Sequence, residues 1–174
     1  MKINTTLCLL GVIPLVVSCA QPITLTTVGP NPITGRSSSF GRGYLQVFSS
    51  LAEESDDQNQ GANGGNPVWF QHTDYNVYDA KGKRVKHVDN TIGHYSTSPR
   101  LVSLQPGTYT VKAEAKDWLL VKVPVLSEPG RTTKVHLDDN WRPPAGTPKA
   151  EVVTSPGGHT VGWRADPGIK APRG

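Results

Sequence analysis

The sequence LVSLQPGTYTVKAEA, residues 101–115, predicts two β-strands separated by a tight turn. Pro106 and Gly107 suit the central positions of a type II turn, because proline presets the first dihedral angle and glycine accepts the positive φ of the second. Beyond the turn, Tyr109, Val111 and Ala113 alternate with polar residues. This period of two is typical of a strand with one buried face and one solvated face.

The same pattern extends along the chain on both sides of this segment. Downstream, residues 119–125 carry an apolar residue at every second position, with Pro124 on the other phase, which favours an edge position or a bulge. Pro129-Gly130 repeats the turn chemistry. The seven strand-like runs are residues 43–50, 67–79, 84–89, 100–105, 108–116, 119–125 and 131–137. Seven half-apolar strands are not stable as one open layer, so the sequence predicts an all-β, seven-stranded antiparallel β-sandwich.

Composition agrees with turns and strands rather than long helices. The 174 residues include 18 glycines and 15 prolines, and the formal net charge is +4. Because the positive charges are interspersed, we expect no nucleic-acid partner. Residues 53–57 form an acidic cluster and residues 81–87 a basic one. Both are typical of solvated loops or hairpins, and lipid phosphate or another envelope polyanion is the functional alternative for the basic cluster.

Two motifs in residues 99–137 resemble a known group of β-sandwich modules. They are L-x-P-G-x-Y-x-V at residues 104–111 and V-x-V-P-V-x-x-x-x-G-R-x-T at residues 121–133. The segment is similar to the carboxypeptidase regulatory-like and transthyretin-like group. It also resembles PEGA-type envelope modules, whose opening strand is similar to residues 43–50. The resemblance implies a sandwich fold and says little about activity, since such folds host many functions.

The N-terminal residues are typical of an exported protein. Lys2 precedes an apolar segment, residues 7–17, which is shorter than the roughly 20 residues needed to span a bilayer. Val16-Val17-Ser18-Cys19 resembles the bacterial lipobox. That resemblance implies cleavage before Cys19, diacylglycerol on its sulfur and a fatty acyl chain such as palmitate on its new amino group. Several acyl chains would anchor the protein durably.

Two alternatives remain for this terminus. Cys19 would be a core thiol or a disulfide partner of Cys8 if the segment were retained, and cleavage after Ala20 would release a soluble protein. Ala20 in place of an aspartate favours the outer membrane, by resemblance to lipoprotein sorting in enteric-type bacteria. We therefore expect a lipid-anchored protein of the cell envelope.

Four parts of the chain follow from these patterns. Residues 1–18 are the signal peptide, 19–42 the lipidated cysteine and a flexible tether, and 43–138 the sandwich domain. Residues 139–174 are a proline- and glycine-rich tail. Within this tail, the runs 151–154 and 159–164 flank Ser155-Pro156-Gly157-Gly158, so a terminal hairpin and a disordered tail are both open.

Motif inspection gives little indication of catalysis. The sequence lacks the G-x-S-x-G, H-E-x-x-H, P-loop and C-x-x-C motifs, and its five histidines are scattered singly. We therefore expect no enzyme, no metal site and no cofactor. Trp141 is the candidate ligand-contacting residue, because it lies in a proline-rich segment where core burial is not expected. The other tryptophans, which suit packing better, are Trp69, Trp118 and Trp163.

The expected function is that of a non-enzymatic, lipid-anchored envelope protein acting as a structural or protein-interaction module. One available mode is the addition of a partner strand to a sheet edge. The alternative is a carbohydrate- or peptidoglycan-binding module that uses exposed tryptophans. The expected partners are thus the membrane, through the lipid, and another envelope protein or a glycan.

Overall fold

Strands of the predicted period build two facing sheets. The computed structural model describes residues 22–32, 41–55, 68–92, 97–116 and 119–165. In these ranges the protein is all-β, and its helical structure is limited to 3-10 turns such as η2 (Lys149–Glu151). No helix there is long and apolar enough to cross a membrane.

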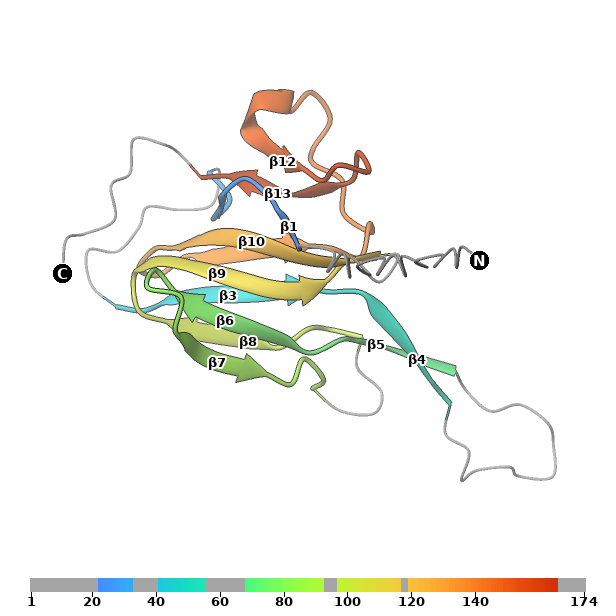
Figure 1. Ribbon diagram of the computed structural model, residues 1–174. Helices are drawn as coiled ribbons and strands as arrows, with labels where there is room; N and C mark the ends of the chain where they lie inside the picture. Colours follow the sequence, from blue (N-terminus) through green and yellow to red (C-terminus); the bar gives the residue numbers. More distant parts are fainter. Residues whose placement is uncertain (1–21, 33–40, 56–67, 93–96, 117–118, 166–174) are drawn as a thin grey trace, which may run out of the picture.

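The larger sheet has the order β12-β13-β2-β10-β9-β6-β7, with β1 also paired to β10 (Figure 1). Its strands are β1 (Ile23–Thr24), β2 (Val28–Gly29), β6 (Tyr75–Asp79), β7 (Arg84–Val88), β9 (Gly107–Glu114), β10 (Leu120–Ser127), β12 (Val152–Thr154) and β13 (Thr160–Arg164). The smaller sheet, in the order β11-β3-β8, contains β3 (Gly43–Phe48), β8 (Leu101–Leu104) and β11 (Thr132–His136). A separate hairpin pairs β4 (Leu51–Ser55) with β5 (Val68–His72) and projects from the layers (Figure 1).

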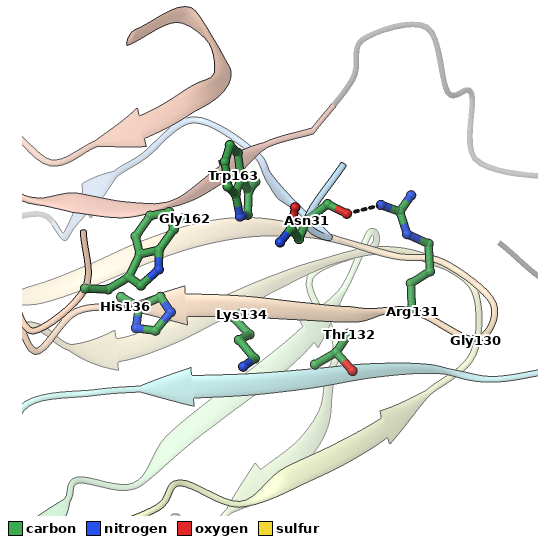
Figure 2. A pocket seen from close by; sticks show the side chains of 9 residues that line it. Asn31, Gly130, Arg131, Thr132, Lys134, His136, Gly162 and Trp163 are labelled. Carbon is green, nitrogen blue, oxygen red and sulfur yellow. Dashed lines mark hydrogen bonds between the residues drawn. The ribbon is translucent and has the colours of Figure 1, made fainter. Parts of the chain in front are cut away.

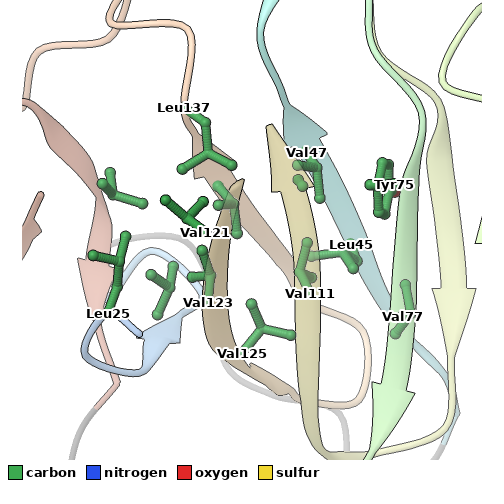
Figure 3. Packing of buried hydrophobic residues seen from close by; sticks show 14 of the residues in the cluster. Leu25, Leu45, Val47, Tyr75, Val77, Val111, Val121, Val123, Val125 and Leu137 are labelled. Atoms are coloured by element: carbon green, nitrogen blue, oxygen red, sulfur yellow. The ribbon is translucent and has the colours of Figure 1, made fainter. Parts of the chain in front are cut away.

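The two sheets share one hydrophobic core. Val77, Val111 and Val123 of the larger sheet are fully buried, as is Val47 of the smaller sheet (Figure 3). Val135 of the smaller sheet is also fully buried. These residues occupy alternate strand positions, as the period of two predicts. The arrangement is therefore sandwich-like, with an all-β core as expected.

Strand number and direction differ from the seven antiparallel strands that the sequence predicts. The described ranges contain thirteen strands, and β1, β2 and β3 each make a parallel pairing, the first two with β10 and the third with β11. The additional strands lie mainly outside residues 43–138. Because β1 and β2 are two residues long, they are too short to show a periodic pattern in the sequence.

One predicted turn is confirmed and the other has a different role. At Pro129-Gly130, Gly130 has φ 69° and the Arg131 amide donates to the Glu128 carbonyl at 3.2 Å, as a type II turn requires. Gly107 instead has φ 152°, far from type II geometry. The chain there crosses from β8 in the smaller sheet to β9 in the larger one, so it does not reverse within a sheet.

Part of the expected tether belongs to the folded domain. Residues 22–32 contain β1 and β2, and the side chains of Leu25 and Val28 are buried in the core. The Leu25 amide donates to the Lys122 carbonyl at 2.8 Å. The prediction of a flexible tether over all of residues 19–42 is thus wrong for residues 22–32. Leu25 and Val28 pack in the core, and the backbone of this segment pairs with β10.

The C-terminal hairpin and the opposite edge strand complete the larger sheet. β12 and β13 pair antiparallel, and β13 continues the sheet through β2. Of the two alternatives for the tail, residues 152–164 therefore form the hairpin. At the other edge, β7 exposes Arg84, Val85, Lys86 and His87, which are charged or polar except for the valine.

Candidate functional site

A cavity lies where the terminal hairpin meets the edge of the smaller sheet. Its volume is about 430 Å³, and it lies between β11 and β13 (Figure 2). Small-molecule sites in proteins commonly have roughly 300–1,000 Å³. The lining residues are Asn31, Gly130, Arg131, Thr132, Lys134, His136, Trp141, Gly162 and Trp163.

One wall of the cavity consists of stacked aromatic rings. The His136 and Trp141 rings are nearly parallel, 11° apart, with centroids separated by 5.0 Å. Trp163 meets Trp141 edge-on at 5.8 Å, and Phe48 stacks on the other side of His136 at 4.3 Å. The stack therefore runs from the smaller sheet to the terminal hairpin, and it fixes the orientation of the Trp141 indole.

An exposed turn after β11 brings Trp141 back onto the domain. Asp139 has φ 61°, a left-handed conformation that aspartate tolerates better than most residues. Its carboxylate accepts hydrogen bonds from Lys116 Nζ at 3.1 Å and Arg142 NH1 at 3.0 Å, and it lies 2.7 Å from His159 Nδ1. The hydrogen bond from Lys116 above all, with those from His159 and Arg142, lowers the pKa of Asp139 to about 2. This carboxylate joins the turn to Lys116, two residues past the end of β9, and to the terminal hairpin.

His136 faces the cavity as a neutral ring. Desolvation by burial, outweighing the attraction of Asp138, lowers the pKa of His136 to about 4. The lining cations are consequently Arg131 and Lys134, since an imidazole with this pKa is unprotonated near pH 7.

Thr132, Lys134 and His136 lie along one face of β11, because alternate residues of a strand share a face (Figure 2). Of these, the Lys134 ammonium is exposed and the His136 ring is buried beneath Trp141. An exposed ammonium beside an aromatic wall offers both a charge and a flat apolar surface to a ligand.

Arg131 closes the other end of the cavity through structural contacts. Its NH1 donates to Glu128 Oε2 at 2.5 Å, and its NH2 donates to the Asn31 carbonyl, the interaction drawn in Figure 2. The Nε atom is buried and has no hydrogen-bond partner among the described residues. The guanidinium thus holds the segment after β2 against β11, with one donor left over.

The closeness of β13 to β11 depends on a glycine. A Cβ atom at Gly162 would lie 2.7 Å from Val28 Cγ1 and 2.8 Å from the Lys134 carbonyl oxygen. Real side chains do not pack at such distances, so only glycine lets the hairpin approach this far. Gly162 therefore sets the width of the cavity.

Of the residues singled out in the sequence, Trp141 lines this cavity together with Trp163. The sequence predicts only that Trp141 is not a core residue, and in the structure its ring is half-buried in the stack. Trp69 lies on β5, and Cys19 and Trp118 lie outside the described residues. Lys134 and His136 were not candidates, although their outward phase on β11 was visible, because the cavity forms only when the distant hairpin packs there.

Neither metal-ligand geometry nor comparison with known proteins assigns a function to the described part of the chain. No group of three or more His, Cys, Asp or Glu side chains in the described ranges could hold a metal ion. Comparison with protein-family models, curated proteins and solved structures finds no match to this chain. The candidate site is therefore defined by its geometry: an aromatic wall, an exposed lysine and a glycine-dependent gap.

Proposed function

We propose that this chain is a non-enzymatic, lipid-anchored protein of the cell envelope that acts as an interaction module. In this proposal its β-sandwich is of the transthyretin-like and carboxypeptidase regulatory-like type, and it binds its partner at the cavity between β11 and β13. The observation that carries the binding role is that cavity of about 430 Å³, with His136, Trp141 and Trp163 as its wall.

Anchoring is supported by the lipobox-like residues 16–19. Diacylglycerol on the Cys19 sulfur and palmitate or a similar acyl chain on its amino group would hold the protein at a membrane. Ala20 favours the outer membrane. Radioactive palmitate incorporated into the chain, and lost in Cys19→Ser, is the expected outcome. A mature chain that begins at Gln21 without lipid would contradict the anchor.

The size of the cavity limits what it binds. It accepts one sugar ring or one side chain of a partner protein, and it is too small for a larger folded element. An aromatic wall with a nearby ammonium and hydroxyl, from Lys134 and Thr132, suits a sugar ring, whose C–H face packs on indoles while its polar groups are hydrogen-bonded. This observation favours the second candidate, a carbohydrate- or peptidoglycan-binding module.

Tryptophan fluorescence separates the two candidates. Titration with soluble cell-wall fragments is expected to quench the emission saturably if the ligand is a glycan, and Trp141→Ala should reduce the affinity at least tenfold by removing part of the wall. Tyr78→Ala, which removes a half-buried aromatic ring from β6 of the larger sheet, away from the cavity-lining residues, is the matched control and should leave the affinity unchanged.

Crosslinking in intact cells then tests the protein-interaction role. With no quenching by glycans, a protein crosslinked to wild type and lost in Trp141→Ala, but retained in Tyr78→Ala, supports a protein partner at the cavity. Glycan titration and crosslinking that both give the same result for wild type and Trp141→Ala would show that the cavity is not the binding site.

A further inference from the structure

Three exposed apolar side chains gather at one end of the larger sheet. β1 runs parallel to β10, with Ile23 opposite Val121, so both strands begin at the same end. β9 finishes there, since Leu120 pairs with Glu114. The exposed fractions at this end are 38% for Ile23, 53% for Leu119 and 50% for Leu120. We call these three residues the apolar end.

The apolar end presents hydrophobic surface on both faces of the sheet. Ile23 shares a face with its partner Val121, and the two line a small cavity of about 80 Å³ with Leu119. Leu120, one position away from Val121, points to the opposite face, together with Lys122. Exposed apolar side chains therefore lie on both faces of the sheet at the ends of these strands. This is the arrangement expected of a sheet end that inserts into an apolar environment.

Chain length ties the apolar end to the proposed lipid. Three residues separate Cys19 from Ile23. An extended chain spans at most about 3.6 Å per residue, so the two α-carbons are no more than roughly 14 Å apart. Since the headgroup layer of a bilayer is about 5–8 Å thick on each side, a Cys19 bonded to membrane lipid keeps Ile23 at or just above that layer.

We propose that the apolar end is a membrane-contacting surface, in which Ile23, Leu119 and Leu120 enter the headgroup region of the bilayer that holds Cys19. This rests on the proposed lipid anchor. A flexible tether over residues 19–42 would hold the domain away from the membrane. In this proposal the domain instead lies directly on the membrane, with the apolar end facing the bilayer. Lys122, on the same face as Leu120, lies where its ammonium can reach lipid phosphates.

An environment-sensitive dye on single introduced cysteines tests the orientation. Full-length lipidated protein carrying Leu120→Cys is labelled and reconstituted into vesicles of phosphatidylethanolamine and phosphatidylglycerol. The matched control is Val85→Cys, an exposed valine (46%) on β7, three strands away across the sheet and level with the middle of β10. Leu119→Cys is a second probe should Leu120→Cys not fold.

At residue 120 or 119 we expect at least a twofold rise in emission on reconstitution and quenching by a spin-labelled lipid. At residue 85 we expect neither. The mass of the N-terminal peptide reports separately whether Cys19 carries lipid. Lipid on Cys19 with equal emission at residues 120 and 85 overturns the membrane-contacting surface alone, and a peptide without lipid overturns the anchor and this surface together.

Discussion

At the scale of single residues, His136 links the aromatic wall to the pH of the surroundings. Its ring is buried between Phe48 and Trp141, and burial favours the neutral form. The groups that face it are Asp138, which raises its pKa, and Lys134 and His72, which lower it. Protonation would place a charge in a desolvated stack, a cost that Asp138 offsets only in part, so the stack itself is sensitive to acid.

Acid should therefore destabilise the domain as the pH falls from 6.5 towards 4. The pKa of His136 is about 4 in the folded protein against 6.5 unfolded, so its contribution to stability is complete above pH 6.5 and is lost as the pH falls through 4. We expect roughly 3 kcal/mol of lost unfolding free energy over this window, measured by urea denaturation. Asp139, with a pKa of about 2, adds its own loss only below its ordinary value of 3.8.

His136→Phe is the diagnostic variant, because phenylalanine keeps an aromatic ring in the stack and cannot be protonated. Its stability should be nearly flat from pH 6.5 to 4. His87→Phe, which changes an exposed ring on β7, should retain the wild-type slope. An unaltered slope in His136→Phe would mean that another group controls the acid response.

At the scale of elements, the contact between β13 and β11 decides whether a cavity exists. Gly162 brings the two strands together, and Asp139 holds the turn that places Trp141 between them. Neither contact follows from strand pairing within one sheet, since β11 belongs to the smaller sheet and β13 to the larger. The site is therefore a product of packing between sheets.

Gly162→Ala should push the terminal hairpin away from β11. The added methyl group would meet Val28 and the backbone of β11, and overpacking of this kind costs about 1–3 kcal/mol of unfolding free energy. Urea denaturation should show the loss, with a red shift of tryptophan emission as Trp141 and Trp163 become wetter. Gly157→Ala, in the turn of the same hairpin, has as its nearest neighbours the side chains of His159 at 3.2 Å and Ser155 at 3.9 Å rather than backbone, and should have a clearly smaller effect on both measurements. Equal effects of both substitutions would contradict the role given to Gly162.

The strands differ in how far they could be predicted from the sequence. The alternation in β9 and β10 and the Pro129-Gly130 turn were predictable, because each is encoded by neighbouring residues. β1 and β2 were not, since two residues cannot display a period, and their partner β10 lies about a hundred residues away. Trp141 could be chosen from its sequence context, but the stack that holds it also needs Phe48 and Trp163, which come from two distant segments.

At the scale of the whole molecule, the folded unit is wider than residues 43–138. Leu25 and Val28 come from the segment before it, and Val153 and Val161 from the segment after it, and all four are in the core. Burying a side chain of this type contributes about 1.5–3 kcal/mol, against a total stability of roughly 5–15 kcal/mol for a domain. The domain boundaries drawn from periodicity alone therefore omit part of the core.

A chain that begins at residue 43 should consequently be less stable than one that begins at residue 22. Loss of Leu25 and Val28 is expected to remove about 3–6 kcal/mol, before any cost of the exposed β10 and β13 backbone. Comparing the urea midpoints of the two chains measures this difference. Equal midpoints would mean that residues 22–32 contribute nothing to the fold.

If the proposed lipid anchor confines the protein to a membrane surface, the charged edge strand β7 has a further consequence. Copies held in two dimensions collide often, and an unpaired strand invites sheet-to-sheet growth. Arg84 and Lys86 lie along that edge, so approaching neighbours meet like charges before their backbones can join. Neighbouring molecules on a crowded membrane would thus stay monomeric, and the cavity of each would remain accessible to the proposed ligand.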